Sequence, residues 1–210
     1  MGPPGSGKGT ISSRIVQNFN LSYLASGDIL RSHIRQQTSY GKQAKSFIEK
    51  GQLVPDELIT SLIMEQLETF SKSNWLLDGF PRTVKQAIDL TSKYNITMAL
   101  NLAVPDDIII ERLEGRWLHP PSGRIYNTSF NPPKVSGKDD ITGEDLVQRE
   151  DDKPEIVLAR LQNYHKGNTP ILEFFSEKKI LKEFAGKETK EIWPKVQLCM
   201  DDIFKNHSKM

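Results

Sequence analysis

Lys8 carries the strongest indication of chemistry in this sequence, because of its neighbours. Residues 2–10 read GPPGSGKGT and match the phosphate-binding pattern G-x-x-x-x-G-K, with Gly9 between the lysine and the hydroxyl of Thr10. Glycines let successive backbone N–H groups turn toward phosphate oxygens, and the N-terminus of a following helix adds partial positive charge. Lys8 would bridge the β- and γ-phosphates of a nucleotide, and Thr10 would lie near Mg²⁺.

The alternative is a Gly/Pro-rich turn that matches this pattern by chance. A helical apolar spacing follows at once, with Ile11, Ile15 and Phe19 four residues apart, and this favours the phosphate-binding loop. Such a loop normally follows a buried strand in the middle of a sheet, whereas this sequence starts at the loop. We expect about 5–6 mostly β-branched or aliphatic residues upstream in the natural chain, preceded by a short targeting extension, or else an impaired product.

A second feature is Asp78, which follows the apolar run WLL and precedes the turn GFPR at 79–82. The run predicts a buried parallel strand with Asp78 at its functional end, where a direct or water-mediated Mg²⁺ contact fits. Arginines recur at the ends of predicted elements, namely Arg31, Arg82, Arg112, Arg116, Arg149 and Arg160. Any one alone would be read as a solvated surface residue. Together they would supply the fixed positive charge that phosphoryl transfer needs.

These residues require a framework of helices and strands. Apolar spacing predicts helices over about 8–18, 29–34, 41–51, 55–67, 84–94, 105–113, 154–164 and 192–203. Ser26 or Asp28 would cap the second of these, and Asp152 with Glu155 has capping-box spacing before the seventh. Short apolar runs predict strands at 23–25, 75–77, 98–104 and 180–184. Strands that alternate with helices after a phosphate-binding loop predict an α/β fold, a parallel sheet with helices on both faces.

Two stretches of the sequence depart from this alternation of strands and helices. Residues 115–152 are rich in Pro, Gly, Asp and Ser and predict an inserted subdomain. Residues 26–54 predict a second, helical insert. The core domain consists of residues 1–25, 55–114 and 153–210.

The net charge of +1 gives no overall attraction for nucleic acid or an anionic membrane. The single Cys199 excludes an intramolecular disulfide and a cysteine-rich zinc site. No apolar run approaches the roughly 18 residues of a membrane span.

Several strings together resemble the adenylate kinase family: the loop at 2–10, SGDILR at 26–31, DGFPR at 78–82 with Gln86, and GRIY at 123–126. The long insert resembles the long-lid branch. Residues 117–127, 148–155 and 192–194 are most similar to the GTP:AMP phosphotransferases of the mitochondrial matrix and their close paralogues (adenylate kinase 3/4 type).

The resemblance implies a P-loop kinase core, an AMP-binding insert at 26–54 and a small β-rich lid at 115–152. It implies Mg²⁺-dependent, reversible transfer of the γ-phosphoryl group of GTP or ATP to AMP. It also implies a monomer in the mitochondrial matrix, with these nucleotides as its partners.

Roles for individual residues also follow from the resemblance. The triphosphate would be bound by Gly5, Ser6, Gly7, Lys8, Gly9, Thr10, Arg116, Ile125, Tyr126 and Thr189. AMP would be bound by Ser26, Arg31, Gln52, Leu53, Val54, Gly79, Phe80, Pro81, Arg82, Gln86, Arg149 and Arg160, with Gln86 reading adenine. The catalytic cations would be Lys8, Arg82, Arg116, Arg149 and Arg160, with Arg112 near them and Asp151 acting as a hinge or orienting the group. Asp78 and Thr10 would contact Mg²⁺, directly or through water.

Some relatives hold the lid together with four cysteines and zinc. The matching lid positions here are His119, Ser122, Asp139 and Thr142, which would hydrogen-bond to one another instead.

Two other functions also fit a phosphate-binding loop. A GTPase-type switch predicts an N-K-x-D motif, which this sequence lacks. A nucleotide-binding protein with weak or no turnover would keep the same sites. Among kinases, one for pyrimidine monophosphates fits less well, because such relatives have a short lid. The sequence leaves GTP and ATP open as donors, since backbone groups would read the donor base.

Overall fold

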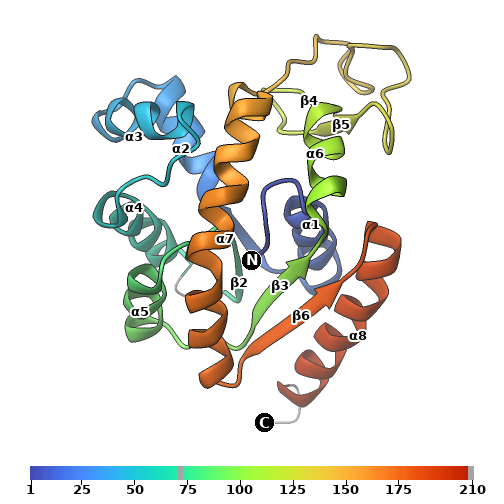
Figure 1. The fold of residues 1–210 in the computed structure, drawn as a ribbon. Helices are drawn as coiled ribbons and strands as arrows, with labels where there is room; N and C mark the ends of the chain where they lie inside the picture. The colour runs from blue at the N-terminus through green and yellow to red at the C-terminus, as the bar shows by residue number, and fades with distance from the viewer. Residues whose placement is uncertain (71–72, 208–210) are drawn as a thin grey trace.

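Two pairs of parallel strands form the centre of the computed structural model, which describes residues 1–70 and 73–207 (Figure 1). β1 (Ser22–Ala25) pairs with β2 (Trp75–Asp78), and β3 (Ala99–Ala103) pairs with β6 (Leu181–Ala185). All four agree with the predicted runs to within one residue at each end. The parallel α/β fold predicted from the sequence is therefore confirmed.

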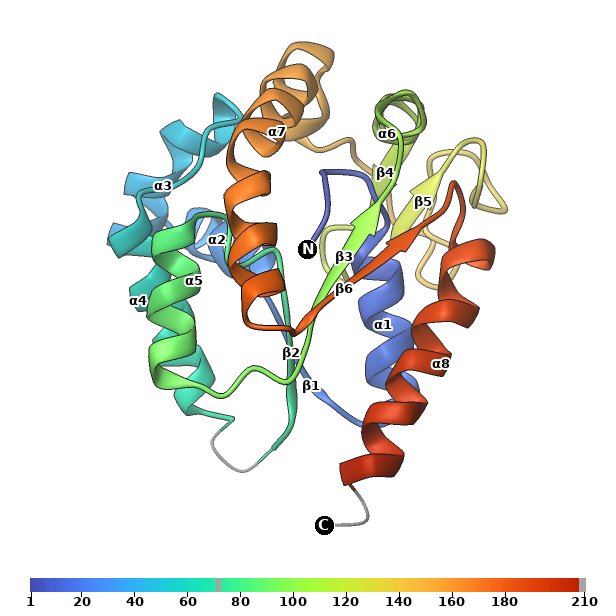
Figure 2. The same cartoon turned by 60° about the horizontal axis from the view of Figure 1, so that its bottom comes forward.

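No strand joins β2 to β3 within the described residues. Met1 lies between the two pairs (Figure 2). Its nitrogen donates to the Leu100 carbonyl, and its carbonyl accepts from the Leu102 N–H at 3.1 Å. This is where the sequence predicts a strand ahead of the phosphate-binding loop. The two strand pairs are connected by packed helices rather than by a continuous hydrogen-bond ladder.

Helices cover both faces of the strands. α1 (Lys8–Phe19) and α8 (Thr189–His207) lie on one side, and α5 (Val84–Lys93) and α7 (Pro154–Glu177) lie on the other (Figure 2). The remaining helices are α2 (Ser26–Arg35), α3 (Ser39–Glu49), α4 (Asp56–Glu68), α6 (Asp106–Glu114) and the 3-10 turn η1 (Glu150–Asp152). Among the described residues, none of these helices is long and apolar enough to span a membrane.

The core beside α1 follows from the apolar spacing of that helix. Ile11 and Ile15 are each 2% exposed and pack in one cluster with Leu102 of β3 and Val196 of α8, which are fully buried. Burying an aliphatic side chain of this size contributes about 1.5–3 kcal/mol. This cluster fixes α1, and with it the phosphate-binding loop that precedes α1.

The helical insert is a close-packed pair, α2 and α3. A Cβ atom at Gly41 would overlap the backbone of His33, so glycine permits this approach of the two helices. The prediction that Ser26 or Asp28 caps α2 is wrong, because Ala25 is at the cap position and no side chain caps the helix. The Ser26 hydroxyl donates instead to the Gly79 carbonyl at 2.8 Å, and the Asp28 carboxylate pairs with Arg31.

The lid contains the antiparallel strands β4 (Arg116–Leu118) and β5 (Ile125–Asn127), as its β-rich prediction requires. The capping box predicted at its end is wrong. Lys153 is the N-cap residue of α7 and provides no side-chain cap, while the Asp152 carboxylate binds Arg116. A two-pronged bond to a guanidinium is stronger than a bond to a neutral N–H group, and only the tertiary structure brings that guanidinium close.

Candidate functional site

The phosphate-binding loop takes the curled form that its glycines permit. Gly5 and Gly7 have positive φ angles of 78° and 86°, and Gly7 is the residue before α1 begins at Lys8. A Cβ atom at Gly5 would lie 2.9 Å from the side chain of Leu113, so the loop packs too closely for a larger residue. The N-terminus of α1 therefore faces the inside of this loop, where an anion is stabilised.

The Lys8 side chain is folded back onto this loop. Its Nζ donates to the carbonyls of Gly2 at 2.9 Å and Pro3 at 2.6 Å. Burial lowers the pKa of Lys8 to about 7, against the opposing effect of the Asp78 carboxylate, and nearby arginines lower it further. A phosphate would replace the two carbonyls and favour the charged form of Lys8.

The arginines predicted at the catalytic centre converge from separate elements. Arg82 precedes α5, Arg116 lies in β4, Arg149 precedes η1 and Arg160 lies in α7. Burial lowers the pKa of Arg149 to about 10, and the positive charge of Arg116 adds to this shift. The pKa of Arg160 is also lowered, by burial first and then by Arg116, against the opposing charge of Asp151. The pKa of Arg82 is lowered too, by desolvation of its guanidinium and then by the charge of Arg160, although the residue is exposed overall. The structure thus brings Lys8 and these four arginines into one electrostatic cluster, which we call the phosphate cluster.

Carboxylates balance only part of the phosphate cluster. Asp152 binds Arg116 through Nε at 2.7 Å, and Asp151 lies 3.1 Å from Arg160. Burial would raise the pKa of Asp151, but Arg160 and then Arg116 hold it below its usual range. The Arg149 Nε is buried and has no hydrogen-bond partner among the described residues. The cluster therefore has positive charge and hydrogen-bond donors in excess, a combination that suits an anion.

Eight of the twelve residues predicted to bind AMP line one hollow of about 50 Å³ between the helical insert and the core, and Arg31, Pro81, Arg149 and Arg160 do not. Those shared with the prediction are Ser26, Gln52, Leu53, Val54, Gly79, Phe80, Arg82 and Gln86. Pro81 follows Phe80 through a cis peptide bond, and Arg31 points its guanidinium at Asp28. Small-molecule pockets usually exceed about 300 Å³, so the hollow in this conformation is smaller than a whole nucleotide.

Gln86 is held at the wall of this hollow by a residue that sequence reasoning missed. Its Oε1 accepts from the Arg82 N–H at 2.6 Å, and its Nε2 donates to Asp56 Oδ1 at 2.7 Å. Thr83 donates to the other Asp56 oxygen at 2.9 Å. In the sequence Asp56 looks like an ordinary first-turn acid after a proline, and nothing links it to a residue 30 positions away.

The predicted donor-side residues are less tightly gathered. Thr189 begins α8 and its hydroxyl lies 4.0 Å from the position a Gly7 Cβ would take, so it adjoins the phosphate-binding loop. Arg112 donates to the Gly5 carbonyl at 3.4 Å, which places it on the same loop. Ile125 is 44% exposed, whereas Tyr126 is 5% exposed and its hydroxyl donates to Asp139 inside the lid. The Tyr126 hydroxyl is therefore occupied inside the lid, and only the main chain of Tyr126 remains for the predicted contact with a donor nucleotide.

Asp78, the predicted Mg²⁺ contact, ends β2 and lies beside α1, with its Oδ2 3.5 Å from the Ser12 hydroxyl. It affects the pKa of Lys8, and its Oδ2 accepts from the Tyr23 hydroxyl at 3.0 Å. Burial, and then Asp78, raises the pKa of Tyr23, so that hydroxyl stays a donor. Thr10 is exposed at the start of α1. The described residues contain no group of three or more acidic, histidine or cysteine side chains that could hold a metal without a ligand's help.

The lid network forms as predicted and is larger than predicted. His119 is 1% exposed, and its Nδ1 lies 2.7 Å from the Ser122 hydroxyl; Thr142 donates to Asp139 at 3.0 Å. Arg124, Tyr126 and Glu144, which the sequence analysis did not assign to this network, complete it. The Arg124 guanidinium, with hydrogen bonds from Thr142 and Tyr126, holds the pKa of Asp139 well below its usual range.

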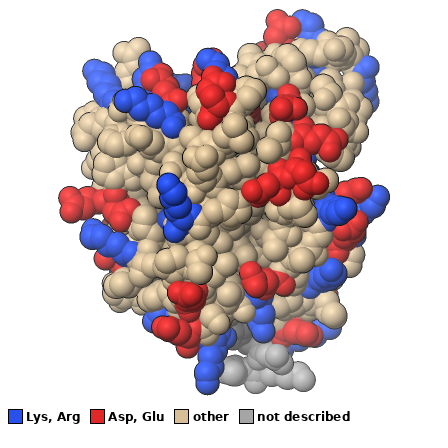
Figure 3. All heavy atoms as spheres, in the orientation of Figure 1, with Lys and Arg blue, Asp and Glu red and all other residues tan. Residues whose placement is uncertain are grey.

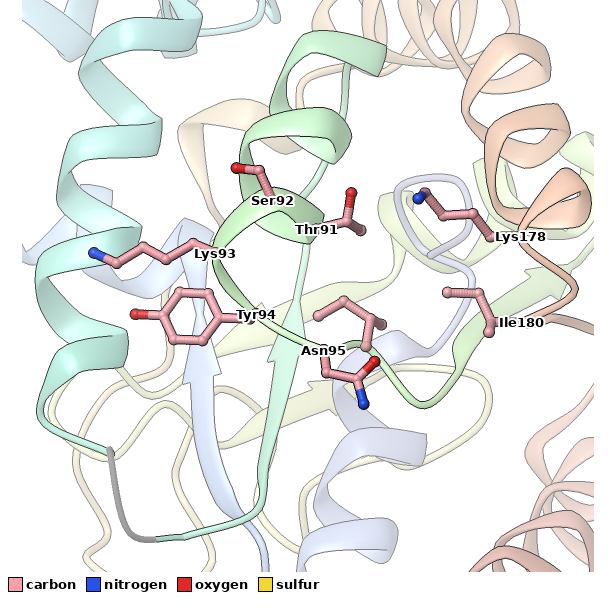
Figure 4. A pocket seen from close by; sticks show the side chains of 8 residues that line it. Thr91, Ser92, Lys93, Tyr94, Asn95, Lys178 and Ile180 are labelled. Atoms are coloured by element: carbon pink, nitrogen blue, oxygen red, sulfur yellow. The ribbon is translucent and has the colours of Figure 1, made fainter.

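A larger hollow lies away from these residues. It holds about 410 Å³ and is lined by residues 91–96 with Lys178 and Ile180 (Figure 4). These residues lie at or just after the C-terminal ends of α5 and α7, whereas Arg82 and Arg160 lie near the N-terminal ends of those helices. Its two lysines have partners, since Lys93 pairs with Glu68 and Lys178 lies over the Phe174 ring. It is a less suitable anion site than the phosphate cluster.

The outer surface shows no comparable concentration of charge on the face seen in Figure 3. Lys and Arg side chains are mixed there with Asp and Glu. The unbalanced positive charge is therefore a property of the phosphate cluster rather than of this surface.

Known proteins resemble this chain over almost its whole length. The family model described as adenylate kinase matches residues 1–180. A Drosophila melanogaster protein named "GTP:AMP phosphotransferase, mitochondrial" is 45% identical over 202 residues, which cover 96% of this chain and 94% of that protein. A protein of Oryza sativa subsp. japonica named "Adenylate kinase 4" is 44% identical over 204 residues, covering 94% of this chain and 84% of that protein.

Proposed function

Because this chain belongs to the adenylate kinase family, we propose that it transfers the γ-phosphoryl group of GTP or ATP reversibly to AMP with Mg²⁺. The observation that carries this proposal is the phosphate cluster. Its cations are only partly neutralised, and they include Lys8 of the phosphate-binding loop and Arg82, which lines the same hollow as Gln86. A site built for one phosphate would not need cations from both sides.

The residues act mainly by position and charge. The loop N–H groups and Lys8 hold the triphosphate, and Arg82 holds the phosphate of AMP at the mouth of the hollow. Arg116, Arg149 and Arg160 neutralise the charge that spreads over the moving phosphoryl group. Attack by a phosphate oxygen of AMP on the γ-phosphorus needs no protein nucleophile. Lid closure excludes water, which would otherwise hydrolyse the donor.

The oxygen donors present are compatible with Mg²⁺ bound together with a substrate. Mg²⁺ is commonly held by one or two carboxylates plus substrate phosphates, with several waters retained. Asp78 supplies one carboxylate beside Lys8, and Thr10 supplies a hydroxyl at the start of α1. When bound, the metal would neutralise the β- and γ-phosphates.

We favour GTP as the donor, because the Drosophila relative carries that activity in its name. Residues beside the phosphate-binding loop that would adjoin the donor base include Thr189, with Ile125 and the main chain of Tyr126 in the lid. Initial rates with both triphosphates competing for limiting enzyme decide this. Faster consumption of ATP would contradict the choice of GTP.

We further propose a monomer in the mitochondrial matrix. The location follows the name of the Drosophila relative. Sedimentation equilibrium would test the first part, and fractionation of the expressing cells the second.

A coupled assay for diphosphate formation tests the function itself. The full chain with Mg²⁺, triphosphate and AMP should produce two diphosphates per turnover, and Arg149→Ala should abolish most of this activity while the protein stays folded. Nucleotide binding without turnover in the full chain would favour the alternative of a binding protein.

A further inference from the structure

Gln86 has a fixed partner at each end of its side-chain amide. Oε1 accepts from the Arg82 N–H at 2.6 Å, and Nε2 donates to Asp56 Oδ1 at 2.7 Å. The residue is only 2% exposed, yet it lines the hollow under the helical insert. An amide oxygen accepts two hydrogen bonds and an amide nitrogen donates two. Each end therefore keeps one position for a ligand.

These partners determine which way round the amide lies. A backbone N–H group only donates and an ionised carboxylate only accepts. Turning the Gln86 amide over would set a donor against the Arg82 N–H and an acceptor against Asp56. Asp56 is fixed in turn, because its Oδ2 accepts from the Thr83 hydroxyl at 2.9 Å and it begins α4, where helix polarity favours a negative charge.

A fixed amide separates bases that a free amide accepts equally. Adenine presents a donor at its 6-amino group and an acceptor at N1. Hypoxanthine presents the reverse, an acceptor at O6 and a donor at N1–H. An amide that can turn over pairs with either base, whereas a fixed one leaves two mismatched pairs with hypoxanthine. Buried polar groups that are left unpaired give strong discrimination.

We propose that Asp56 sets the base preference of the monophosphate site, by holding Gln86 so that it accepts from a 6-amino group and donates to N1. This inference rests on the proposed function, in which AMP occupies the hollow. Asp56 is a positioning residue, because it acts through Gln86. Its signature is a change in the ratio of two nucleotides rather than a general loss of rate.

The test compares AMP with IMP in the full chain. The value of kcat/KM is measured under saturating triphosphate and Mg²⁺, and Kd is measured by titration calorimetry without triphosphate. Asp56→Ala should lower the AMP:IMP preference by about 10- to 100-fold, the usual effect of losing one hydrogen bond to a charged group. Asp56→Ser, whose hydroxyl suits a helix start but is too short to reach Gln86, should do the same. Asp56→Asn keeps an acceptor oxygen and should retain most of the preference.

Glu57→Gln is the matched control. It removes one negative charge from the same first turn of α4, and Glu57 is exposed, so the preference should not change. Equal losses for AMP and IMP in folded Asp56→Ala or Asp56→Ser would overturn the proposal and leave Asp56 a structural residue. Failure of the unsubstituted chain to use AMP would instead overturn the proposed function.

Discussion

The lid network and the phosphate cluster both gather charged side chains, but they balance charge differently. In the lid, the buried Asp139 receives hydrogen bonds from Arg124, Tyr126 and Thr142, and His119 lies against Ser122 and Glu144. These side chains satisfy one another without a ligand. The charges and hydrogen bonds of the lid network are therefore balanced within the lid itself.

In the phosphate cluster, by contrast, neither the charges nor the hydrogen bonds are fully balanced. Lys8 bonds only to groups of its own loop, and the Arg149 Nε lacks a partner among the described residues. The pKa values of Lys8, Arg82, Arg149 and Arg160 are lowered by desolvation and by neighbouring cations. The comparison indicates that the lid network stabilises the folded protein. The phosphate cluster, which we propose binds an anion, lowers stability in the absence of that ligand.

The largest expected effect is in the phosphate cluster. Lys8→Ala should reduce turnover by about 10³–10⁵-fold, since a single cation that stabilises the transferring phosphoryl group can be worth that much. The coupled assay at saturating nucleotide measures this. Near-normal turnover in Lys8→Ala would remove the phosphate-binding loop from the mechanism.

Arg149→Met sharpens the comparison, because function and stability should move apart. Turnover should fall by about 10²–10³-fold. The melting temperature without nucleotide should stay level or rise by about 1–3 °C, since an incompletely paired cation leaves the interior. A melting temperature that falls by several degrees would mean that the folded state needs this cation.

Asp139→Ala in the lid network should have the opposite effect to Arg149→Met, with a large loss of stability and a small loss of activity. It removes the common acceptor of Arg124, Tyr126 and Thr142, so buried donors lose their partner. The melting temperature should fall by about 5 °C or more. Activity at low temperature should fall far less than in Lys8→Ala. The conservative variant Asp139→Asn keeps one acceptor oxygen and should show a smaller decrease.

The pH dependence of triphosphate binding should also report on Lys8. Its pKa is lowered to about 7 in the free protein, so the cation is lost as the pH rises above 7. Bound phosphate favours the charged form, and affinity should therefore fall by up to about tenfold per pH unit above 7. The same titration with Lys8→Ala separates this from ionisation of the nucleotide. Equal profiles for both proteins would contradict the shift.

The smallest expected effect is that of metal removal on the lid. A strong chelator should leave the melting temperature of the nucleotide-free protein unchanged, because one cysteine cannot build a structural zinc site. Elemental analysis of the purified protein provides the control. Bound zinc together with a chelator-induced decrease would show that the lid network is a metal site after all.

Contiguous motifs carried most of what the sequence predicted. Lys8 in its loop and Asp78 at the end of β2 depend on local patterns, and the structure places both as expected. Asp56 could not be found this way, because its role depends on Gln86, which only folding brings within 2.7 Å. The two wrong caps have the same origin, since Asp152 and Ser26 found stronger partners far along the chain. Local rules predict elements better than they predict competition among polar side chains.

The separation of β2 from β3 bears on how heat would unfold this chain. The β1–β2 pair leads into Ser26 and Arg82 on the AMP side, and the β3–β6 pair leads into Arg112 and Thr189 on the donor side. Without a shared ladder, the two halves can open as separate cooperative units. Calorimetry should then show two heat-absorption steps, with AMP delaying one and triphosphate the other. A bisubstrate ligand that joins both nucleotides should merge them, so that catalysis and cooperativity of the fold are completed by the same molecule.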